Sequence, residues 1–534
     1  MTGRAARPAR RPRPARPARP ARPWWYAALL GFAGMALVSI SWALLAPPVS
    51  GPDEASHLIR AETVVHGHLV LDGLDSRGFP VAPVSPGGGQ LWAQICYLLD
   101  PSLSAACAPG LSEATEPTTL AATGAGRYNP VYYAAVGWPS LLMSGDGAVL
   151  AMRVVSALLN SAFIGLAFGA IAQLRRRSAA ALGLFVGLTP MVGYLVSIVN
   201  PNSVEITAAA ALFAWLTLLV LQPSRRAMPL RAGVILVSAL MVLSARAITP
   251  LWALLIIIAA LLLPDRARWS VLVRSAWTWA ALAVGAVLSA GAIAWVVIVA
   301  PLTPTAPYPG VGDDFTTAFT TMLIRTMEYG RDLFGQFLTL RPPDALVLAL
   351  AAGTLAIIAS ALVQGRGRAR ITTAFLALSI LLAPAFVQGV SAFEHGYIWQ
   401  GRYVLALLPP LLIAAGLAIR SGTLVRQARI WTTVFAVLSA AAIVAGQIIV
   451  FGRVAVGTDR PWWQAFANPE WTPPIPAIAC FVIASAGVAL LAFASVTASA
   501  RVPADTRRAD TTRADTTRAA GVSRPGGGVE RESL

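Results

Sequence analysis

The segment SGPDEASHLIRAETVVHG, at residues 50–67, gathers carboxylate, imidazole and guanidinium groups in a chain of which only 12% of residues are charged. If Pro52 begins a helix, Asp53, His57 and Arg60 lie at positions i, i+4 and i+7 and share one face. A carboxylate on that face can take a proton from a hydroxyl group or bind a divalent cation such as Mg²⁺ or Mn²⁺, and an arginine can hold a phosphate. The spacing therefore indicates a site for acid–base or phosphate chemistry, in which Asp53 is the candidate base or metal ligand.

A purely structural interpretation fits the same residues. The sequence S-G-P-D at residues 50–53 matches an S-x-x-D capping box. The helix dipole also favours Asp53 and Glu54 in a first helical turn without any catalysis. The spacing alone leaves both interpretations open; in the functional one, Asp53 and Glu54 are the candidate catalytic carboxylates, and His57 and Arg60 bind substrate.

Further cationic residues lie where apolar segments begin or end. Arg402 follows a short segment that contains Glu394 and His395, and Arg246 separates two apolar runs. Ionisable residues at membrane depth are candidates for function, so Arg402, Arg246 and His395 are candidate substrate- or phosphate-binding residues. Each arginine can instead reach the lipid headgroups or pair with Glu205 or Glu394 for structure alone.

The rest of the chain consists largely of apolar segments that must position these groups. The 534 residues are 56% hydrophobic, with a mean hydropathy of +0.66. Runs of about 16–27 apolar residues reach or approach the length that crosses a ~30 Å hydrocarbon core. We predict an all-α, polytopic membrane protein of about twelve transmembrane helices. The predicted spans are 24–46, 147–173, 179–199, 203–222, 230–245, 248–263, 274–300, 343–364, 371–390, 401–420, 429–452 and 474–498.

Arginine clusters predict the orientation of these spans. All 41 basic residues are arginine. Placing the Arg-rich amino-terminal tail in the cytoplasm puts every clustered loop on the cytoplasmic side, as the positive-inside rule requires. The clusters are Arg175, Arg176 and Arg177; Arg225, Arg226 and Arg231; Arg266, Arg268 and Arg274; Arg366, Arg368 and Arg370; Arg420, Arg426 and Arg429.

Low-complexity sequence marks both tails. The runs RPARPARPARP and TRRADTTRADTTRAA lack the apolar residues that a packed core needs. We predict disordered cytoplasmic tails at 1–23 and 499–534 and one membrane domain at 24–498. The predicted outer loops of this domain are 48–146, 302–342, 391–400 and 453–473.

Two outer segments are apolar but are not expected to span. RYNPVYYAAVGWPSLLM is too short to cross, so we expect it to lie at the interface or dip back into the membrane. FTTAFTTMLIRTMEYGRDLFGQFL mixes apolar and charged positions, which predicts an amphipathic helix on the surface. Cys96 and Cys107 both fall in the first outer loop, where an oxidising environment favours a disulfide between them, whereas Cys480 lies in a span.

The net charge of +17 is accounted for by topology, so we expect no nucleic-acid partner. The sequence contains no P-loop, no G-x-G-x-x-G after a strand, no G-x-S-x-G and no zinc-spaced Cys/His cluster. An ATP-driven pump is therefore disfavoured.

Four motifs carry a resemblance to a known family. PDEASHLIRA after the first span, RYNPVYY, TPMVGYLVSIVNPNSVEI and QGRYVLALLPPLL occur in this order over about residues 24–420. Together they resemble the bacterial membrane-protein family of domain of unknown function 2142. That family is similar in layout to the C-type glycosyltransferases, which carry an acidic motif in the first outer loop and use polyprenyl-phosphate-linked sugars. The resemblance implies a C-type glycosyltransferase-like fold in a bacterial plasma membrane, with Asp53 as base or metal ligand and Glu54 as its neighbour; the acceptor-recognition motif of an oligosaccharyltransferase is missing.

The leading functional hypothesis is transfer of a sugar from a polyprenyl-phosphate carrier to an outer-face acceptor in the cell envelope. Its expected partners are the lipid-linked sugar, an envelope glycan or lipid acceptor, and membrane lipids, with a divalent cation as candidate cofactor. The alternatives are a transporter or flippase of a lipid-linked envelope precursor and a non-enzymatic envelope-assembly protein. A transporter is expected to show two similar halves with charges near mid-membrane. Here we find no repeat, and the charges concentrate at the outer edge.

The predicted orientation can be tested with reporter fusions. Fusions after Arg177, Arg226, Arg268, Arg370 and Arg429 should report cytoplasm, and fusions near Gly88 and Thr316 should report the outside, because arginine-rich loops stay on the cytoplasmic side. Two or more opposite results would overturn the span count and the outward placement of Asp53.

Overall fold

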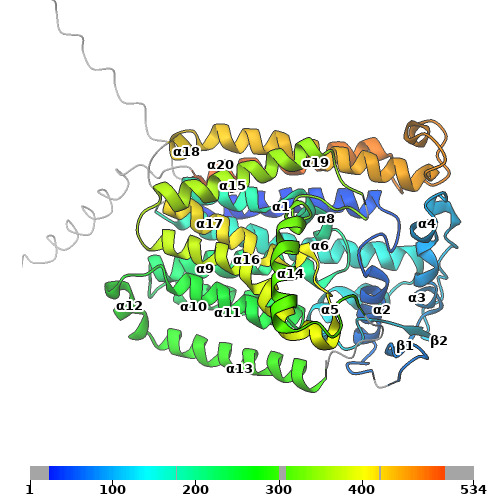
Figure 1. Cartoon of the computed structure of the whole chain (residues 1–534), viewed down its shortest axis with the longest axis horizontal. Helices are drawn as coiled ribbons and strands as arrows, with labels where there is room; N and C mark the ends of the chain where they lie inside the picture. The colour runs from blue at the N-terminus through cyan, green and yellow to red at the C-terminus, as the bar shows by residue number, and fades with distance from the viewer. Residues whose placement is uncertain are drawn as a thin grey trace, which may run out of the picture. The chain divides into compact units, whose positions relative to one another are not determined.

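The computed structural model describes residues 23–71, 73–175, 177–299, 308–338, 340–419 and 423–499. Trp24–Ser499 form one unit, which is almost entirely helical (Figure 1). The predicted tails, apart from Pro23 and Ser499, lie outside the described residues, as do Arg176 and Arg420 of the arginine clusters.

Ten segments of the described chain are long and apolar enough to cross a membrane. They are α1 (Trp24–Leu45), α6 (Gly145–Gln173), α9 (Pro201–Leu221), α10 (Met228–Ala245), α13 (Ala276–Ile298), α15 (Asp344–Gln364), α16 (Arg368–His395), Gly401–Ala418, α19 (Ala428–Val456) and α20 (Ala477–Ser499). Within Gly401–Ala418, the 3₁₀ helix η5 (Gly401–Leu407) leads into α17 (Leu408–Ala418).

Two bent helix pairs bring the number of candidate spans in the described chain to the predicted twelve when each pair is counted as one span. The first pair is α7 (Ser178–Gly187) with α8 (Pro190–Val196), bent by 60°; the second is α11 (Thr249–Leu261) with α12 (Arg266–Val273), bent by 119°. The expected continuous span 179–199 is therefore wrong in detail. Thr189 takes an extended conformation because the ring of Pro190 disfavours a helical residue before it, and the helix breaks there.

The helix α1 packs closely against α6 and α20. A Cβ on Gly34 would lie 2.8 Å from the Gly487 carbonyl oxygen, and one on Gly165 would lie 2.6 Å from the Ala28 carbonyl oxygen. Only glycine permits such backbone approach, which is a common way for membrane helices to associate. The interface places the carboxyl end of α1, where the chain enters the first large loop, against the start of α6.

The first large loop carries short elements at one end of the long helices (Figure 1). Its helices are α2 (Glu54–Val65), α3 (Pro86–Gly89), α4 (Cys96–Leu99) and α5 (Pro130–Gly137), with 3₁₀ turns η1 (Leu91–Ile95), η2 (Ala105–Cys107) and η3 (Trp138–Leu141). An antiparallel pair, β1 (Val81–Val84) with β2 (Thr119–Ala122), sets Val81 opposite Ala122. The α5–η3 segment packs on α2 and is too short to span. We call this the loop end of the unit.

The remaining loops are also partly helical. The second large loop contains α14 (Phe315–Glu328), which packs on α16, followed by η4 (Tyr329–Arg331). The helix α16 continues to His395, so the predicted outer loop 391–400 begins as the last helical turn of α16. The last elements are α18 (Thr423–Arg426) and η6 (Trp462–Phe466). The short helices α12 and α18 lie away from α2, at the end that we call the arginine end (Figure 1).

The structure contains a disulfide between Cys96 and Cys107, while Cys480 is buried and free. We expect mass spectrometry after alkylation without reductant to find Cys96 and Cys107 unmodified, and to find both alkylated after reduction. Alkylation of both thiols before reduction would contradict the disulfide.

Candidate functional site

The turn that enters α2 differs from the predicted one. The helix begins at Glu54 instead of Pro52, and Asp53 precedes it with a φ of 59° in the left-handed region. The predicted shared helical face of Asp53, His57 and Arg60 is therefore wrong, because Asp53 lies outside the helix. The Asp53 side chain makes no capping hydrogen bond, so the capping interpretation does not describe it either. A left-handed non-glycine residue costs about 1–2 kcal/mol, and such strain is concentrated at functional sites.

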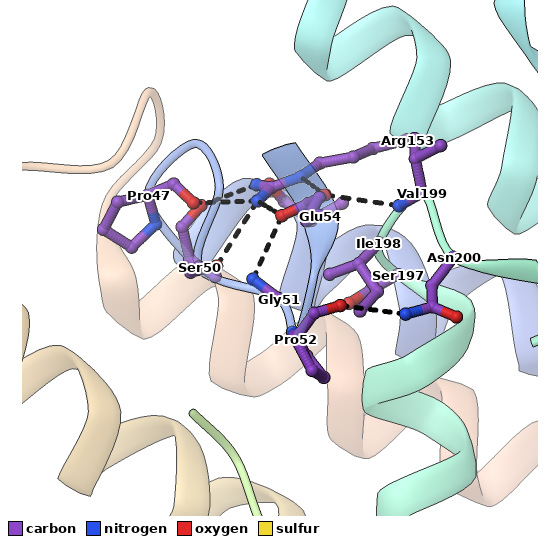
Figure 2. Close-up of polar contacts among 12 residues, drawn as sticks. Pro47, Ser50, Gly51, Pro52, Glu54, Arg153, Ser197, Ile198, Val199 and Asn200 are labelled. Carbon is purple, nitrogen blue, oxygen red and sulfur yellow. Dashed lines mark hydrogen bonds and ion pairs between the residues drawn. The ribbon is translucent and has the colours of Figure 1, made fainter. Parts of the chain in front are cut away.

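Glu54 is fully buried and bonded on both carboxylate oxygens (Figure 2). Its Oε2 accepts from Arg153 Nη2 at 2.6 Å and from the Gly51 amide at 3.0 Å. Its Oε1 accepts from Arg153 Nε at 2.7 Å and from the Val199 amide at 3.2 Å. A carboxylate with these partners is held in place and has no open face toward a substrate.

Arg153, on α6, completes this buried pair. It is 2% exposed, and beyond Glu54 it donates to the carbonyls of Ala46 at 2.9 Å and Pro47 at 2.8 Å. The carbonyl groups at the end of α1 have no partners within that helix, and the guanidinium supplies some. One ion pair therefore joins the end of α1, the start of α2 and the amino-terminal part of α6.

A second set of bonds fixes the same turn from α8 and from the segment between α8 and α9. The Tyr194 hydroxyl donates to the Ser50 carbonyl at 3.0 Å, and Asn200 Nδ2 donates to the Pro52 carbonyl at 2.9 Å. Figure 2 shows Asn200 reaching Pro52 across the turn. A Cβ on Gly51 would meet Ile198 at 2.5 Å, so the turn lies directly on this segment. The turn is thereby held with the Asp53 side chain outward, at 62% exposure.

Asp53 meets Arg402 across 349 positions of sequence. Arg402 Nη2 lies 3.1 Å from Asp53 Oδ2, and Arg402 itself is only 13% exposed. The guanidinium carbon of Arg402 lies 5.5 Å from the centre of the Tyr403 ring, and that of Arg246 lies 3.7 Å from the same ring. The structure thus brings three predicted site residues together: Asp53, Arg246 and Arg402. We call Arg246 and Arg402 the arginine pair.

Polar atoms without hydrogen-bond partners gather around the arginine pair. Arg246 Nη1 is 3.6 Å from Glu205 Oε2, which also accepts from Asn202 Nδ2 at 3.2 Å. Within the described chain, buried atoms without a hydrogen-bond partner include Arg246 Nη1, Arg402 Nε, Glu205 Oε1 and Asn202 Oδ1. A buried polar atom without a partner costs about 1–3 kcal/mol. The cluster therefore has unused capacity to bind both anionic and hydroxyl groups.

His57 lies in an aromatic surrounding beside this cluster. Its Nδ1 is 2.8 Å from the Tyr133 hydroxyl, and its ring meets that of Tyr128 edge to face. Burial lowers the pKa of His57 to about 4, the Asp53 charge opposes that shift, and the charges of Arg246 and Arg402 add to it. The imidazole is therefore neutral at neutral pH, and it contributes hydrogen bonds and no positive charge.

Arg60 and His395 are not part of this convergence. The Arg60 guanidinium donates to the carbonyls of His68, Leu69 and Tyr128 at 2.7–3.1 Å, and burial lowers its pKa to about 10. These bonds join the loop after α2 to the loop before α5. His395 ends α16 with a buried Nδ1 that has no hydrogen-bond partner in the described chain.

The site does not fit a resident divalent cation. Ca²⁺ and Mg²⁺ prefer several oxygen ligands, and the described residues contain no group of three or more His, Cys, Asp or Glu placed to hold a metal ion. Asp53, the candidate ligand, faces Arg402 instead.

Tyr403 is the residue that sequence reasoning missed. Both guanidinium groups of the arginine pair lie near its ring. Its signal was its place directly after Arg402 in the Q-G-R-Y motif, next to a residue already selected for its charge.

Comparisons with known proteins place the chain in a wider context. The family model described as "Predicted membrane protein (DUF2142)" matches residues 36–411. Among solved structures, the crystal structure of ArnT from Cupriavidus metallidurans in the apo state is similar over 88% of this chain and 76% of that chain, at 16% identity and a TM-score of 0.40. The search of curated proteins found no match.

Neutralising the two neighbouring carboxylates, Glu54 and Asp53, should change the stability of the fold by very different amounts. Glu54→Gln leaves the Arg153 charge buried and unpaired, which should destabilise the fold by about 3–5 kcal/mol. Asp53→Asn removes an exposed partner and keeps a residue that tolerates the left-handed conformation, so its stability should change by less than about 1 kcal/mol. Thermal unfolding of the purified variants in detergent measures both. Equal stability of the two variants would contradict the structural role of Glu54.

Proposed function

This chain belongs to the DUF2142 family of predicted membrane proteins, and we propose that it is a glycosyltransferase of the bacterial plasma membrane. It moves a sugar from a polyprenyl-phosphate carrier to a hydroxyl acceptor, an envelope glycan or lipid, at the outer face. The observation that carries the proposal is the ion pair of Asp53 with Arg402 beside Arg246. This ion pair places the exposed carboxylate of Asp53 next to the partly buried guanidinium group of Arg402.

Asp53 is the proposed base. Its carboxylate takes the proton of the acceptor hydroxyl while the acceptor oxygen forms a bond to the anomeric carbon of the sugar. The bond between that carbon and the phosphate oxygen breaks, and its electron pair leaves with the polyprenyl phosphate. The products are the glycosylated acceptor, the free lipid phosphate and a protonated Asp53, which later returns its proton to water.

The arginine pair is the proposed phosphate site. Guanidinium groups bind phosphate oxygens in a bidentate manner and stabilise the charge that develops on a leaving phosphate. Arg402 Nε is buried without a hydrogen-bond partner, and Arg246 Nη1 makes only a 3.6 Å ion pair with Glu205, so both retain capacity to donate to such an anion. A phosphate that takes Arg402 also releases Asp53 from its ion pair, so donor binding prepares the base.

The other predicted site residues are proposed to support the site and to contact substrate, without taking part in the proton transfer. Glu54 holds the turn that presents Asp53, and Arg60 holds the loops on either side of α2 and α5. His57 contacts Tyr133 and Tyr128 as a neutral hydrogen-bonding group. His395, at the end of α16, stays a candidate for acceptor contact outside this cluster. With both termini in the cytoplasm, this site faces the outer side, where an envelope acceptor is found.

Neutralising Asp53 should stop transfer without loss of folded protein. Membranes that contain the wild-type chain are incubated with radiolabelled polyprenyl-phosphate sugars, and the label that leaves the lipid fraction for an envelope acceptor is counted. Asp53→Asn should lower this rate by about 100-fold or more because the base is lost. Arg402→Ala should do the same because the leaving phosphate loses its partner, and His57→Ala should fall between these variants and wild type.

Arg77→Gln is the matched control, because it breaks an exposed ion pair, with Asp75, in the same loop. It should transfer at the wild-type rate. Full activity of Asp53→Asn at matched membrane levels would refute the catalytic role. Label that crosses the membrane while staying on its lipid would identify a flippase instead.

A further inference from the structure

We infer that a second binding site, for the headgroup of an anionic phospholipid, lies at the arginine end of the unit. A cavity of about 540 Å³ opens there. The cavity is lined by Leu174, Arg175, Leu221, Gln222, Leu263, Asp265, Arg268, Gly367, Arg368, Ala369 and Leu417. This inference is independent of the proposed transfer reaction.

The cavity is at the far end of the helices that build the candidate functional site. The helix α9 carries Glu205 near its start and reaches the cavity at Leu221, 16 residues after Glu205. At ~1.5 Å per residue, this separates Glu205 from the cavity by roughly 24 Å, most of the ~30 Å thickness of a hydrocarbon core. The helix α16 likewise begins at the cavity with Arg368 and ends at His395.

The lining of the cavity has two chemically distinct parts. Four leucines, from the ends of α6, α9, α11 and α17, form an apolar part. Arg175 after the end of α6, Arg268 in α12 and Arg368 at the start of α16 supply the positive charge, against one carboxylate, Asp265. A small soluble anion has no apolar part that could contact the leucines, whereas a phospholipid presents a phosphate next to apolar chains.

The charge on this lining is largely uncompensated. Arg268 pairs with Asp265 at 3.1 Å on the surface, where such a pair contributes little. Within the described chain, neither Arg175 nor Arg368 has an ion-pair partner. The start of α16 also lines the cavity and has no side-chain cap, so its partial positive charge adds to that of the arginines.

Bonds between neighbouring elements hold the cavity walls in place. The Thr372 hydroxyl of α16 donates to the Ala259 carbonyl of α11 at 3.2 Å, and the Arg366 amide donates to the Ala418 carbonyl at 3.3 Å. Gln222 Nε2 donates to the Gln173 carbonyl at 3.3 Å, joining the ends of α9 and α6. The three arginines are therefore gathered by the fold itself, and not only by the positive-inside bias that places arginine in these loops.

The test measures lipid binding by the purified full chain in detergent with native mass spectrometry. Phosphatidylglycerol should bind as one retained lipid, at least 10-fold more tightly than phosphatidylcholine of the same acyl chains. The variant Arg175→Gln/Arg268→Gln/Arg368→Gln should lose this preference. The control Arg225→Gln/Arg226→Gln/Arg429→Gln removes as many charges from exposed positions outside the cavity lining and should keep it.

Three results would overturn the proposal. They are equal loss of binding in both triple variants, equal binding of the two lipids by wild type, and stabilisation of wild type by 1 mM inorganic phosphate but not by phosphatidylglycerol. If the triple variant does not fold, the single variants Arg175→Gln and Arg225→Gln are compared instead. The proposal requires that Arg175→Gln weaken the preference for phosphatidylglycerol over phosphatidylcholine and that Arg225→Gln leave it unchanged.

Discussion

The buried ion pair between Glu54 and Arg153 is the constraint on which the arrangement of the candidate functional site depends. Burying two charges costs several kcal/mol per ion, and their attraction offsets that cost only when the geometry is good and the remaining donors and acceptors are bonded. Both conditions are met: the guanidinium also bonds the carbonyls of Ala46 and Pro47, and the carboxylate also accepts from the amides of Gly51 and Val199. One interaction thereby joins α1, α2, α6 and the segment before α9.

That constraint explains why two adjacent carboxylates have different roles. With Glu54 turned inward, the chain reverses direction over Asp53, which takes the left-handed conformation and points its side chain outward. The strain of this conformation is borne by the surrounding bonds to Ser50 and Pro52. The exposed carboxylate then meets Arg402, which arrives from a segment far along the chain. The position of the proposed base is thus set by its buried neighbour.

Arginine is used in two ways at the two ends of the unit. At the loop end, Arg153 and Arg246 lie within reach of carboxylates, and their side chains are almost fully buried. At the arginine end, Arg175 and Arg368 line a cavity beside apolar side chains without ion pairs in the described chain. The first arrangement gives the fold a defined geometry, because a buried unpaired charge is costly. The second leaves charge available for an anionic ligand at the membrane surface.

The sequence by itself determined the class of the protein and most of its spans, because the length of an apolar run and the distribution of arginine depend only on local composition. It also indicated Asp53, Arg246 and Arg402 as candidates, because a charged residue beside an apolar span is costly without a purpose. Only the tertiary structure decided which of these residues meet. The inward turn of Glu54 depends on Arg153, 99 residues away, and the ion pair of Asp53 depends on Arg402, 349 residues away. A helical pattern that placed Asp53, His57 and Arg60 on one face could not predict this, because long-range bonds to the turn outweighed the local preference to begin the helix at Pro52.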